Sequence, residues 1–451
     1  MSFPKYLAYK DSGVEWIGEI PTKWCLVPLK SAARFVGGGT PSKDNLQYWN
    51  GSIPWVSPKD MKSDVIVDTE DHITDKAISE TATQIVPSGN VLLVVRSGIL
   101  RHTIPVAINA MEVALNQDMK CIIINHKLYD VHYIFRLIQG ANSALLPLWS
   151  KQGATVESLE FDYISNTVFP LPPLSEQQEI ASFLDRECGK IDTLIAEQER
   201  LIALLAEKRQ AVISHAVTKG LNPNAPMKDS GTPLIGMVPN RWKCCRLRFV
   251  AEFNPSKTEI SNFPFTEEVS FLPMESIGND GSIDLSQQRK ISDVLNGYTY
   301  FRDEDVIFAK ITPCFENGKG ALVKGLLKGI GFGTTELVVA RAISSYVIPD
   351  YLFLFFQSYV FRQPTEASMY GAGGQKRVSE QFVRNFTIPL PPLPEQQAIA
   401  NWVQHECGKI DALISEQKNM FSLLKERRAA LISAAVTGKI DVRNQNKDNA
   451  A

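Results

Sequence analysis

Four loops of the chain combine glycine, hydroxyl, amide and basic residues, a mixture suited to phosphate oxygens and to the edges of nucleic-acid bases. Backbone N–H groups, Ser and Thr reach phosphate, while Gln, Asn, Arg and Lys form paired hydrogen bonds with adenine and guanine. The candidates are Gly38, Gly39, Thr40, Ser42, Lys43, Lys151, Gln152 and Thr155 in the first half, and Lys310, Thr312, Asn317, Lys319, Gln375, Lys376 and Arg377 in the second. A single polar loop residue is more often only solvated, so the prediction applies to the set.

Two of these loops occupy matching places in the sequence. Residues 150–155 and 371–377 each lie shortly before the sequence Pro-Leu-Pro-Pro-Leu, which begins at Pro170 and again at Pro389. This matched location favours a shared role for the two loops.

The chain is an internal duplication. Residues 170–218 recur from Pro389 at an offset of 219 positions, and the segment from Lys10 to Trp24 echoes the segment from Lys228 to Trp242 at an offset of 218. This period is far longer than the roughly 20 to 50 residues of a solenoid repeat. Each unit therefore consists of a marker segment, a variable block and a helix, and is the size of a domain.

Each Pro-Leu-Pro-Pro-Leu segment precedes a predicted helix with a heptad pattern. Ser175 and Gln178 have the spacing of a capping box, and Gly220 and Gly438 lie where C-terminal caps are expected, so each helix would run about 40 residues, or ~60 Å. The residues expected to pair the helices are Leu184, Ile191, Leu194, Gln198, Leu201 and Leu205 in the first helix and Val403, Ile410, Leu413, Gln417, Met420 and Leu424 in the second. Lys208 and Arg427 would add a basic residue at the same heptad position of each helix. The alternative, a surface helix on a single core, is disfavoured by the length of both stripes.

The variable blocks, residues 25–169 and 243–388, lack obvious similarity to each other. Short β-rich runs such as Val91–Val95 alternate with Gly, Pro and Asn turns, while residues 131–139 and 351–361 are typical of helices. We therefore predict an α+β fold for each block, on one scaffold with two different specificities.

The composition does not by itself indicate a nucleic-acid partner. The 47 Lys and Arg residues are balanced by 49 Asp and Glu residues, for a net charge of −2, so any such surface must be locally basic. The seven cysteines show no CxxC spacing, which argues against a disulfide framework and a zinc site. No run approaches the ~18 apolar residues of a membrane span, and a cytoplasmic location without membrane contact is expected.

Several short motifs suggest catalysis but lack the required context. Phe35–Gly39 and Gly329–Gly333 resemble methyl-donor and dinucleotide loops, yet neither is placed between a strand and a helix with a suitably spaced acidic residue. His405-Glu406-Cys407 corresponds to Arg186-Glu187-Cys188 in the first helix, so its histidine is not part of the repeated design. We expect no catalytic residues and no metal site on this chain.

Taken together, these features closely resemble the specificity (S) subunit of type I restriction-modification systems. The resemblance is carried by both copies of PLPPL(S/P)EQQ…CGKID, by the SG…IG…P…W markers, and by the runs Gly37–Trp55 and Ala309–Leu322. It implies two α+β target-recognition domains joined by two long antiparallel coiled-coil helices in a pseudo-two-fold arrangement. Each domain would read one half of a split double-stranded DNA target, and the helices would set the spacing and bind two modification subunits.

The resemblance also implies where the chemistry takes place. In that family the modification (methyltransferase) subunit carries the S-adenosylmethionine site and methylates adenine, and a restriction/translocase subunit supplies ATP-driven translocation and cleavage. It therefore implies that this chain is non-catalytic and binds no cofactor, with S-adenosylmethionine, ATP and Mg on partner subunits. The alternatives are a helical scaffold without DNA contact and a single-chain methyltransferase fusion, whose donor and catalytic motifs are missing from the sequence.

The expected boundaries follow the repeat. They are 1–169 for the first recognition domain, 170–220 for the central helix, 221–388 for the second recognition domain, 389–440 for the C-terminal helix and 441–451 for a polar tail.

Overall fold

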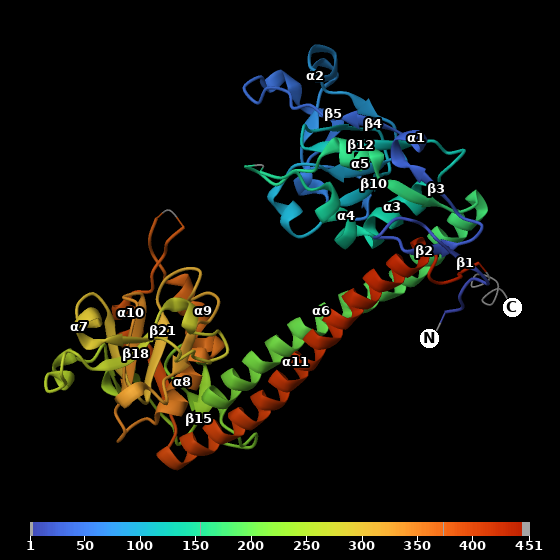
Figure 1. The fold of residues 1–451 in the computed structure, drawn as a ribbon. Coiled ribbons are helices and arrows are strands. Elements are labelled where there is room, and N and C mark those ends of the chain that lie inside the picture. Colours follow the sequence, from blue (N-terminus) through green and yellow to red (C-terminus); the bar gives the residue numbers. More distant parts are fainter. Residues whose placement is uncertain (1–2, 154, 373, 444–451) are drawn as a thin grey trace. The chain divides into compact units, whose positions relative to one another are not determined.

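The computed structural model describes residues 3–153, 155–372 and 374–443, which pack as two compact units. Unit 1 contains the chain up to Glu199 together with the chain from Asn419 onward, and unit 2 contains Arg200–Lys418. Each unit therefore combines one globular body with about half of each of two long helices (Figure 1). The expected fold class is confirmed: two α+β domains accompany two long helices that pack together.

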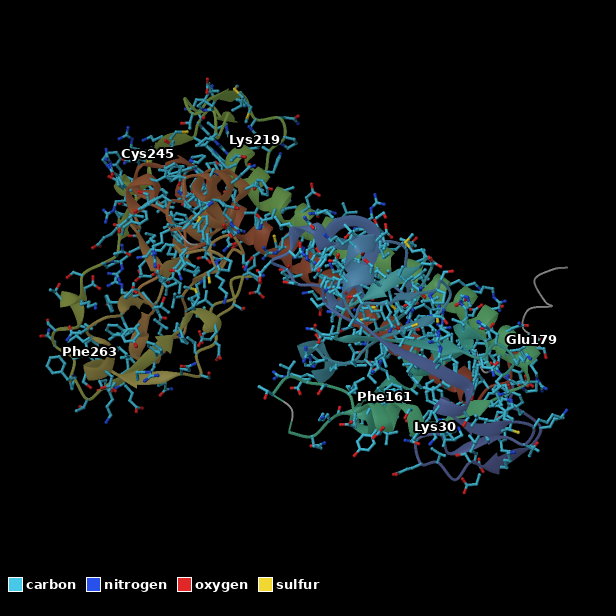
Figure 2. The ribbon with its side chains drawn as sticks, turned by 90° about the horizontal axis from the view of Figure 1, so that it is seen from above. Lys30, Phe161, Glu179, Lys219, Cys245 and Phe263 are labelled. Atoms are coloured by element: carbon cyan, nitrogen blue, oxygen red, sulfur yellow. The ribbon has the colours of Figure 1, made fainter. Side chains whose placement is uncertain are left out.

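The two long helices are α6 (Leu174–Lys219, 46 residues) and α11 (Leu393–Val436, 44 residues). Figure 2 labels Glu179 near the start of α6 and Lys219 at its end. Gly220 and Gly438 follow the two helices with φ of +73° and +75°. Glycine adopts this left-handed conformation without the steric cost of a Cβ, which is why it ends helices so often.

The first turn of α6 differs from the expected capping box. Ser175 lies inside α6, and Gln177 provides the local hydrogen bonds instead of Gln178. Its Nε2 donates to the Pro172 carbonyl at 2.9 Å, and its Oε1 accepts from the Asp130 N–H at 2.8 Å. Gln396 makes the equivalent bonds to the Pro391 carbonyl and the Ile348 N–H, each at 2.9 Å. The repeated glutamine thus fastens each helix start to the neighbouring globular body.

The helices run antiparallel within each unit. In unit 1, Arg428 Nε of α11 donates to Asp192 Oδ1 of α6 at 2.7 Å. In unit 2, Arg209 Nε of α6 donates to Asp411 Oδ1 of α11 at 2.9 Å. Residue numbers rise along one helix as they fall along the other. The two ion pairs are copies of each other under the 219-residue repeat.

The residues expected to pair the helices form two rows, one for each of two heptad positions. The first row lies where α6 and α11 pack together, and the second row does not. Leu184, Ile191, Val403, Ile410 and Leu424 are at most 8% exposed, and Gln198, Leu205 and Gln417 are half-buried. The second row is exposed: Leu194 44%, Leu201 39%, Leu413 45% and Met420 46%.

The row that accompanies the first one is shifted by one residue from the expected row. Ile195, Ile202, Ile414 and Phe421 are half-buried where their neighbours in the expected row are exposed. In the same way, Arg209 and Arg428 are half-buried and paired, whereas the expected Lys208 and Arg427 are exposed. The prediction was shifted because apolar residues stand at both adjacent positions, Leu194 beside Ile195, Leu201 beside Ile202 and Leu413 beside Ile414, so the sequence pattern fits either row.

Unit 1 is built on two main sheets. The five-stranded sheet has the order β4 (Ala33–Gly37), β12 (Met119–Ile124), β9 (Val91–Val94), β10 (Val106–Asn109), β6 (Val65–Ile66), and the four-stranded sheet has the order β7 (His72–Ile73), β5 (Trp49–Val56), β11 (Val113–Leu115), β8 (Ile85–Val86). Two-stranded pairs join β1 (Tyr9–Asp11) to β2 (Glu19–Pro21) and β3 (Cys25–Pro28) to β13 (Val168–Leu171). Strand β9 is buried along its whole length, as expected for an apolar central strand.

The helices of unit 1 surround these sheets. They are α1 (Leu29–Ala32), α2 (Asp75–Glu80), α3 (Val131–Gly140), α4 (Asn142–Trp149) and α5 (Phe161–Asn166). Helix α3 lies against β9 and β10, and its start is capped by Asp130, whose side chain accepts from the Tyr133 N–H. The main core of the unit continues from the sheet through α3 onto buried residues of α6 and α11.

Unit 2 repeats the plan with different sequence. Its sheets have the orders β17 (Ala251–Phe253), β24 (Leu337–Ala342), β21 (Asp305–Ala309), β22 (Gly320–Leu322), and β19 (Gln288–Lys290), β18 (Glu268–Leu272), β23 (Ile330–Gly333), β20 (Thr299–Arg302). The pairs are β14 (Met227–Asp229) with β15 (Met237–Pro239) and β16 (Lys243–Arg246) with β25 (Thr387–Leu390). Its helices are α7 (Ile291–Val294), α8 (Pro349–Gln357), α9 (Tyr359–Ala367) and α10 (Glu380–Asn385).

The tyrosines Tyr133 and Tyr351 show how closely the two plans correspond. In unit 1 the Tyr133 hydroxyl donates to the Val436 carbonyl at 3.0 Å, and in unit 2 the Tyr351 hydroxyl donates to the Val217 carbonyl at 3.1 Å. Helices α3 and α8 therefore hold equivalent places, and each ties a globular body to the end of a long helix. Of the predicted polar tail, Asp441 donates its N–H to the Pro4 carbonyl at 2.8 Å; residues 444–451 lie outside the described residues.

Candidate nucleic-acid interface

The loop of unit 1 that was predicted from Lys151 is a hairpin base with exposed polar residues. Ser150 pairs with Leu159, and the Lys151 N–H donates to the Ser158 carbonyl at 2.8 Å. Ser158 also bridges to Arg96, which follows strand β9. The pairing holds Lys151, Gln152 and Thr155 in the exposed part of the loop. Figure 1 shows the hairpin extending away from the body of the unit.

The matching loop of unit 2 is also a hairpin, based on Tyr370 and Arg377. The Tyr370 N–H donates to the Arg377 carbonyl at 3.1 Å and the Arg377 N–H to the Tyr370 carbonyl at 2.8 Å. Arg377 also bridges to Ile311, two residues after β21. Figure 1 shows this hairpin as a narrow projection from the unit. Gln375 and Lys376, on its returning strand, are exposed.

The two hairpins are equivalent parts of the duplicated plan. Each comes after a helix, α4 or α9, and each pairs with the residues that follow a central strand, β9 or β21. Sequence reasoning found their matched position but missed Arg96 and Arg101. The structure places Arg96 beside the hairpin base, and both side chains are more than half exposed. The signal for Arg96 is its place two residues after the buried apolar strand β9, because polar groups there lie near the strand end.

The second half of the chain brings two separately predicted loops together. The Lys376 N–H donates to Thr312 Oγ1 at 3.0 Å, and Thr312 Oγ1 donates to the Gly374 carbonyl at 2.8 Å. The N–H of Thr312 in turn donates to the Lys376 carbonyl at 3.0 Å. Thr312 therefore supports the hairpin through three hydrogen bonds. The hairpin in turn carries the exposed Gln375 and Lys376 side chains.

Arg377 is engaged by a carboxylate at the base of the hairpin. Its Nη2 donates to Glu336 Oε1 at 2.7 Å and its Nε to Glu336 Oε2 at 3.0 Å. These bonds hold the pKa of Glu336 below its ordinary value. A guanidinium held in this way positions the hairpin, whereas Lys376 makes no ion pair among the described residues.

Lys310, Asn317 and Lys319 lie in the other loop and have unlike surroundings. Lys319 is half-buried, and its Nζ donates to the Met274 carbonyl at 2.7 Å. Lys310 is half-buried, and its backbone pairs with Glu336 and Val378. Asn317 is exposed. Lys319 therefore stabilises the packing within the unit through its bond to Met274. Of the three residues, Asn317 is the most accessible to a ligand.

Close packing accounts for Gly38 and Gly39 of the first loop. A Cβ on Gly38 would lie 1.9 Å from the Asn116 carbonyl oxygen, so no side chain fits there. The Gly39 N–H already donates to the Leu115 carbonyl at 2.8 Å, and its carbonyl accepts from Trp55 Nε1 at 3.0 Å. The loop is thus packed against the unit, and the N–H and carbonyl of Gly39 are occupied.

The rest of this loop divides by exposure. Ser42 and Lys43 are exposed, while the Thr40 hydroxyl is buried without a hydrogen-bond partner among the described residues. Ser42 and Lys43 remain accessible to phosphate, but Thr40 is not.

Basic side chains around the unit 1 hairpin are largely paired with acids. Arg96 bonds Asp118 and Arg101 bonds Glu157, both at 2.6 Å, and Lys151 lies 3.4 Å from Glu160. Exposed pairs of this kind are weak, so a phosphate can compete for the cations at small cost. The local positive charge is present but partly masked, which agrees with the near-neutral composition.

The described residues contain no group of three or more His, Cys, Asp and Glu side chains arranged to hold a metal ion. Burial raises the pKa of the Cys121 thiol to about 12, and it also raises the pKa of Cys188 and of Cys407. These thiols are therefore neutral at physiological pH and are poor nucleophiles. Within the same part of the chain, every helix is too short or too polar to cross a bilayer.

Comparison with protein families gives matches in both units. The model described as the type I restriction modification DNA specificity domain matches residues 21–201 and 239–419. The type I restriction enzyme MjaIX specificity subunit of Methanocaldococcus jannaschii is 32% identical over 448 residues, which cover 94% of this chain and 95% of that protein.

Other relatives match over part of their length. The type I restriction enzyme EcoAI specificity subunit of Escherichia coli is 40% identical over 225 residues, 49% of this chain and 37% of that protein. The EcoR124I/EcoR124II subunit of the same organism is 39% identical over 191 residues, 42% of this chain and 43% of that protein. The chain therefore matches less than half the length of these two curated relatives.

A similar fold is found among solved structures. A chain described under "Structural basis underlying complex assembly and conformational transition of the type I R-M system" has a TM-score of 0.63 at 17% identity, covering 92% of this chain and 98% of that chain. At this level of identity the likeness shows the fold alone.

Proposed function

The chain belongs to the family of type I restriction-modification DNA specificity subunits, and from that premise we propose that each unit reads one half of a bipartite double-stranded DNA target. The observation that carries this proposal is the pair of hairpins at equivalent places in two bodies of different sequence. One scaffold that presents two unlike sets of polar side chains suits a protein that reads two unlike half-sites.

We assign the contacts within each unit by accessibility. Gln152, Thr155, Gln375 and Lys376 are exposed on the hairpins and can reach base edges or phosphates. Ser42, Lys43 and Asn317 are exposed on neighbouring loops and suit backbone contacts. Gly38, Gly39, Thr312, Lys319 and Arg377 support these loops through their bonds and packing.

The helices α6 and α11 carry the proposed spacing and docking roles. Because each is a single unbroken helix of 46 or 44 residues, the number of residues in them sets a fixed length along the helix axis. Inserting about one helical turn into both helices is expected to change the tolerated gap between half-sites and leave the half-site sequences unchanged. We place two modification subunits on the exposed sides of these helices.

The chemistry belongs to the partners in this proposal. The modification subunits would bind S-adenosylmethionine and methylate adenine, and the restriction/translocase subunits would use ATP and Mg. This chain would choose the target. A cytoplasmic location follows from the proposed partners, which act on cellular DNA.

The competing proposal is a scaffold that assembles partners through its helices and does not touch DNA. Hydroxyl-radical footprinting of the full chain with its modification subunit separates the two. We expect two protected stretches of specific sequence with an unprotected gap between them. Protection that requires only the modification subunit, or that ignores sequence, would contradict DNA reading by this chain.

A further inference from the structure

In unit 1 an arginine of helix α3 links the globular body to the long helices. Arg136 has an 8% exposed side chain, and its Nη1 donates to Asp64 Oδ2 at 3.0 Å and to Gln139 Oε1 at 2.8 Å. Its Nη2 donates to Asp185 Oδ1 of α6 at 2.8 Å. Three acceptors from three segments thus surround one guanidinium, whose planar fork of donors suits such an arrangement.

Asp64 of this cluster also accepts hydrogen bonds from α3 and from the long helix α11. Gln139 Nε2 donates to Asp64 Oδ1 at 2.8 Å, and Arg428 Nη2 donates to Asp64 Oδ2 at 3.3 Å. Burial alone would lower the pKa of Arg428, but its bonds to Asp192 and the charge of Asp64 raise it. Every polar group of this cluster therefore has a charged or hydrogen-bonded partner.

Unit 2 has the acceptors of this cluster but not its arginine. Tyr133 and Tyr351 make equivalent bonds, so helices α3 and α8 correspond at an offset of 218. At that offset Gln139 corresponds to Gln357, and Arg136 corresponds to Leu354. The guanidinium of unit 1 is replaced by an apolar side chain.

Asp64 of unit 1 and Asp280 of unit 2 hold corresponding places as well. Asp64 follows a short 3-10 helix, Pro58–Asp60, by four residues, and Asp280 follows the 3-10 helix Met274–Ser276 by four residues. The repeat offset of 219 places Gln404 where unit 1 has Asp185. Unit 2 thus retains an aspartate and a glutamine, Asp280 and Gln357, and has the neutral amide of Gln404 in place of the third acceptor, Asp185.

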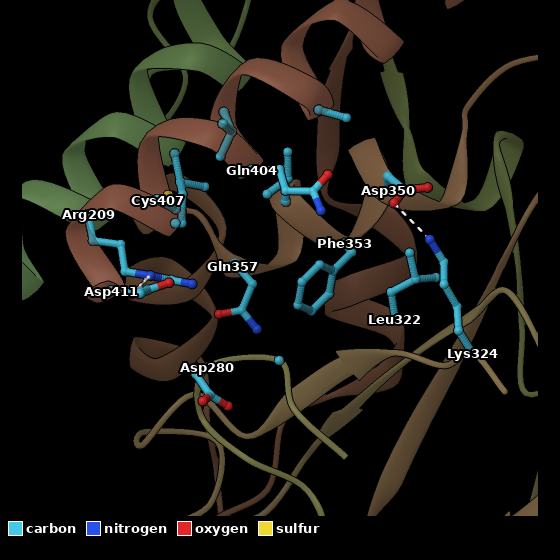
Figure 3. Close-up of a pocket in the computed structure, with 16 residues that line it drawn as sticks. Arg209, Asp280, Leu322, Lys324, Asp350, Phe353, Gln357, Gln404, Cys407 and Asp411 are labelled. Atoms are coloured by element: carbon cyan, nitrogen blue, oxygen red, sulfur yellow. Dashed lines mark hydrogen bonds and ion pairs between the residues drawn. The ribbon is translucent and has the colours of Figure 1, made fainter. Parts of the chain in front are cut away.

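A pocket of about 390 Å³ lies where the guanidinium would be. It is lined by Asp280, Leu354, Gln357 and Gln404, together with the Arg209–Asp411 pair. Figure 3 shows Gln357 between that ion pair and Phe353, with Asp280 on the opposite wall.

The polar groups of the pocket are poised for one cation. Gln357 is 6% exposed, and its Oε1 is buried with no hydrogen-bond partner among the described residues. The Asp280 carboxylate is oriented by the Ser282 N–H at 2.9 Å and hydroxyl at 2.6 Å, which lower its pKa. Asp411 is paired with Arg209 and Asp350 with Lys324. Asp280 is therefore the one lining carboxylate without an ion pair among the described residues.

We propose that the pocket of unit 2, lined by Asp280, Gln357 and Gln404, is a receptor for the guanidinium of an arginine side chain that a docked protein partner inserts. The inference rests on the proposed function, which places modification subunits on these helices. A guanidinium fits better than an ammonium, because three acceptors on separate walls match its planar set of five donors. Unit 1 fills the equivalent place from its own chain, so the two docking sites differ in this contact.

The first test concerns the chain alone and asks whether the pocket accepts a guanidinium. Leu354→Arg is combined with Asp280→Asn in a double-mutant cycle, and Leu354→Met with Asp280→Asn is the control cycle. Unfolding is measured by urea denaturation. We expect Asp280→Asn to raise the unfolding constant at least threefold more in the Leu354→Arg background than in the Leu354→Met background. Equal effects in the two backgrounds would overturn the receptor.

The second test concerns the partner and uses the full chain with its modification subunit. Titration calorimetry is expected to show two bound modification subunits. Asp280→Asn is expected to lower the affinity for one of them about tenfold or more. The matched change Asp64→Asn alters an occupied cluster and is expected to leave partner affinity within twofold of wild type. Unchanged affinity for Asp280→Asn would overturn insertion by that partner.

A third measurement, on the Leu354→Arg chain with its modification subunit, makes these readouts independent of DNA reading. Leu354→Arg places a guanidinium of the chain itself in the pocket. It is therefore expected to weaken binding of the same modification subunit whose binding Asp280→Asn weakens. Full binding of both subunits by a folded Leu354→Arg chain would overturn the proposal. The DNA footprint fails separately, because a chain that binds both partners but protects no half-site contradicts the proposed function and not the pocket.

Discussion

Arg428 and Asp192 are joined by a 2.7 Å hydrogen-bonded ion pair between α11 and α6, and the repeat reproduces it as Arg209 and Asp411 at 2.9 Å. The duplication therefore extends from sequence to individual side-chain contacts. The pairs also define which sides of the helices face each other, because each basic partner lies one residue beyond the position that the heptad pattern predicted.

Replacing Arg428 by Met is expected to lower the free energy of unfolding by about 1 kcal/mol, a value for partly exposed pairs in a network. Arg428 contacts both Asp192 and Asp64, so its loss leaves two carboxylates without this partner. Arg427→Met is the matched control, because Arg427 is exposed on the adjacent position. Urea denaturation of both variants measures the difference. A larger effect for Arg427→Met would restore the heptad frame predicted from sequence.

Lys376 and Lys319 are expected to differ in DNA binding. Lys376→Ala should weaken binding and reduce the salt dependence by about one phosphate contact, because Lys376 is exposed and makes no ion pair among the described residues. Lys319→Ala should leave the salt slope unchanged, since Lys319 Nζ is bonded to the Met274 carbonyl. Fluorescence anisotropy of the complex with modification subunits, over a range of salt concentrations, checks both. Equal slopes for all three proteins would remove Lys376 from the interface.

Gly38 is expected to act through packing. Gly38→Ala would place a Cβ 1.9 Å from the Asn116 carbonyl oxygen, which forces the backbone to shift and costs about 1–3 kcal/mol of unfolding free energy. Gly37→Ala is the control, since its nearest neighbour would be the Lys120 Nζ at 3.9 Å. Thermal unfolding distinguishes them. Wild-type stability of Gly38→Ala combined with weaker DNA binding would favour a direct phosphate contact.

The base of the unit 2 hairpin is expected to loosen in acid. Arg377 lowers the pKa of Glu336 from its ordinary value of 4.5, so the folded pKa lies below the unfolded one. The stabilisation is therefore complete above about pH 5 and is lost as the pH falls through the folded pKa. Hydrogen exchange at residues 370–377, corrected for intrinsic rates, should show this loss in the wild type and not in Glu336→Gln. The same acid response in Glu336→Gln would assign it to another group.

Much of the fold could be predicted from sequence because its signals are local or repeated. The ends of α6 and α11 follow from glycine at 220 and 438, and the duplication follows from direct identity. The second row of residues that pair the helices was predicted one residue too early. Leu194 and Leu413 were chosen because they are apolar, but they are 44% and 45% exposed. Periodicity alone does not tell a seam leucine from one that lies outside the seam.

The candidate site was predictable in position and less so in role. The hairpins were found from their place before the repeated prolines, yet sequence could not show that Thr312 supports Lys376 or that Glu336 holds Arg377. These contacts join residues tens of positions apart, and only the folded chain brings them together. The glycine loop was predicted to contact phosphate, whereas the structure shows that close packing against Asn116 requires glycine at position 38.

The central claim is that each unit reads its own half of the DNA target, and methylome sequencing tests it most directly. Cells that carry the modification subunit would express either the wild-type chain or a chain with Gln375→Ala and Lys376→Ala. A matched variant would carry Lys151→Ala and Gln152→Ala in the unit 1 hairpin. We predict that each variant relaxes or abolishes recognition at one half of the methylated motif, a different half for each, and keeps the gap and the other half. Changes in both halves from a single hairpin, or an unchanged motif from both variants, would contradict the account.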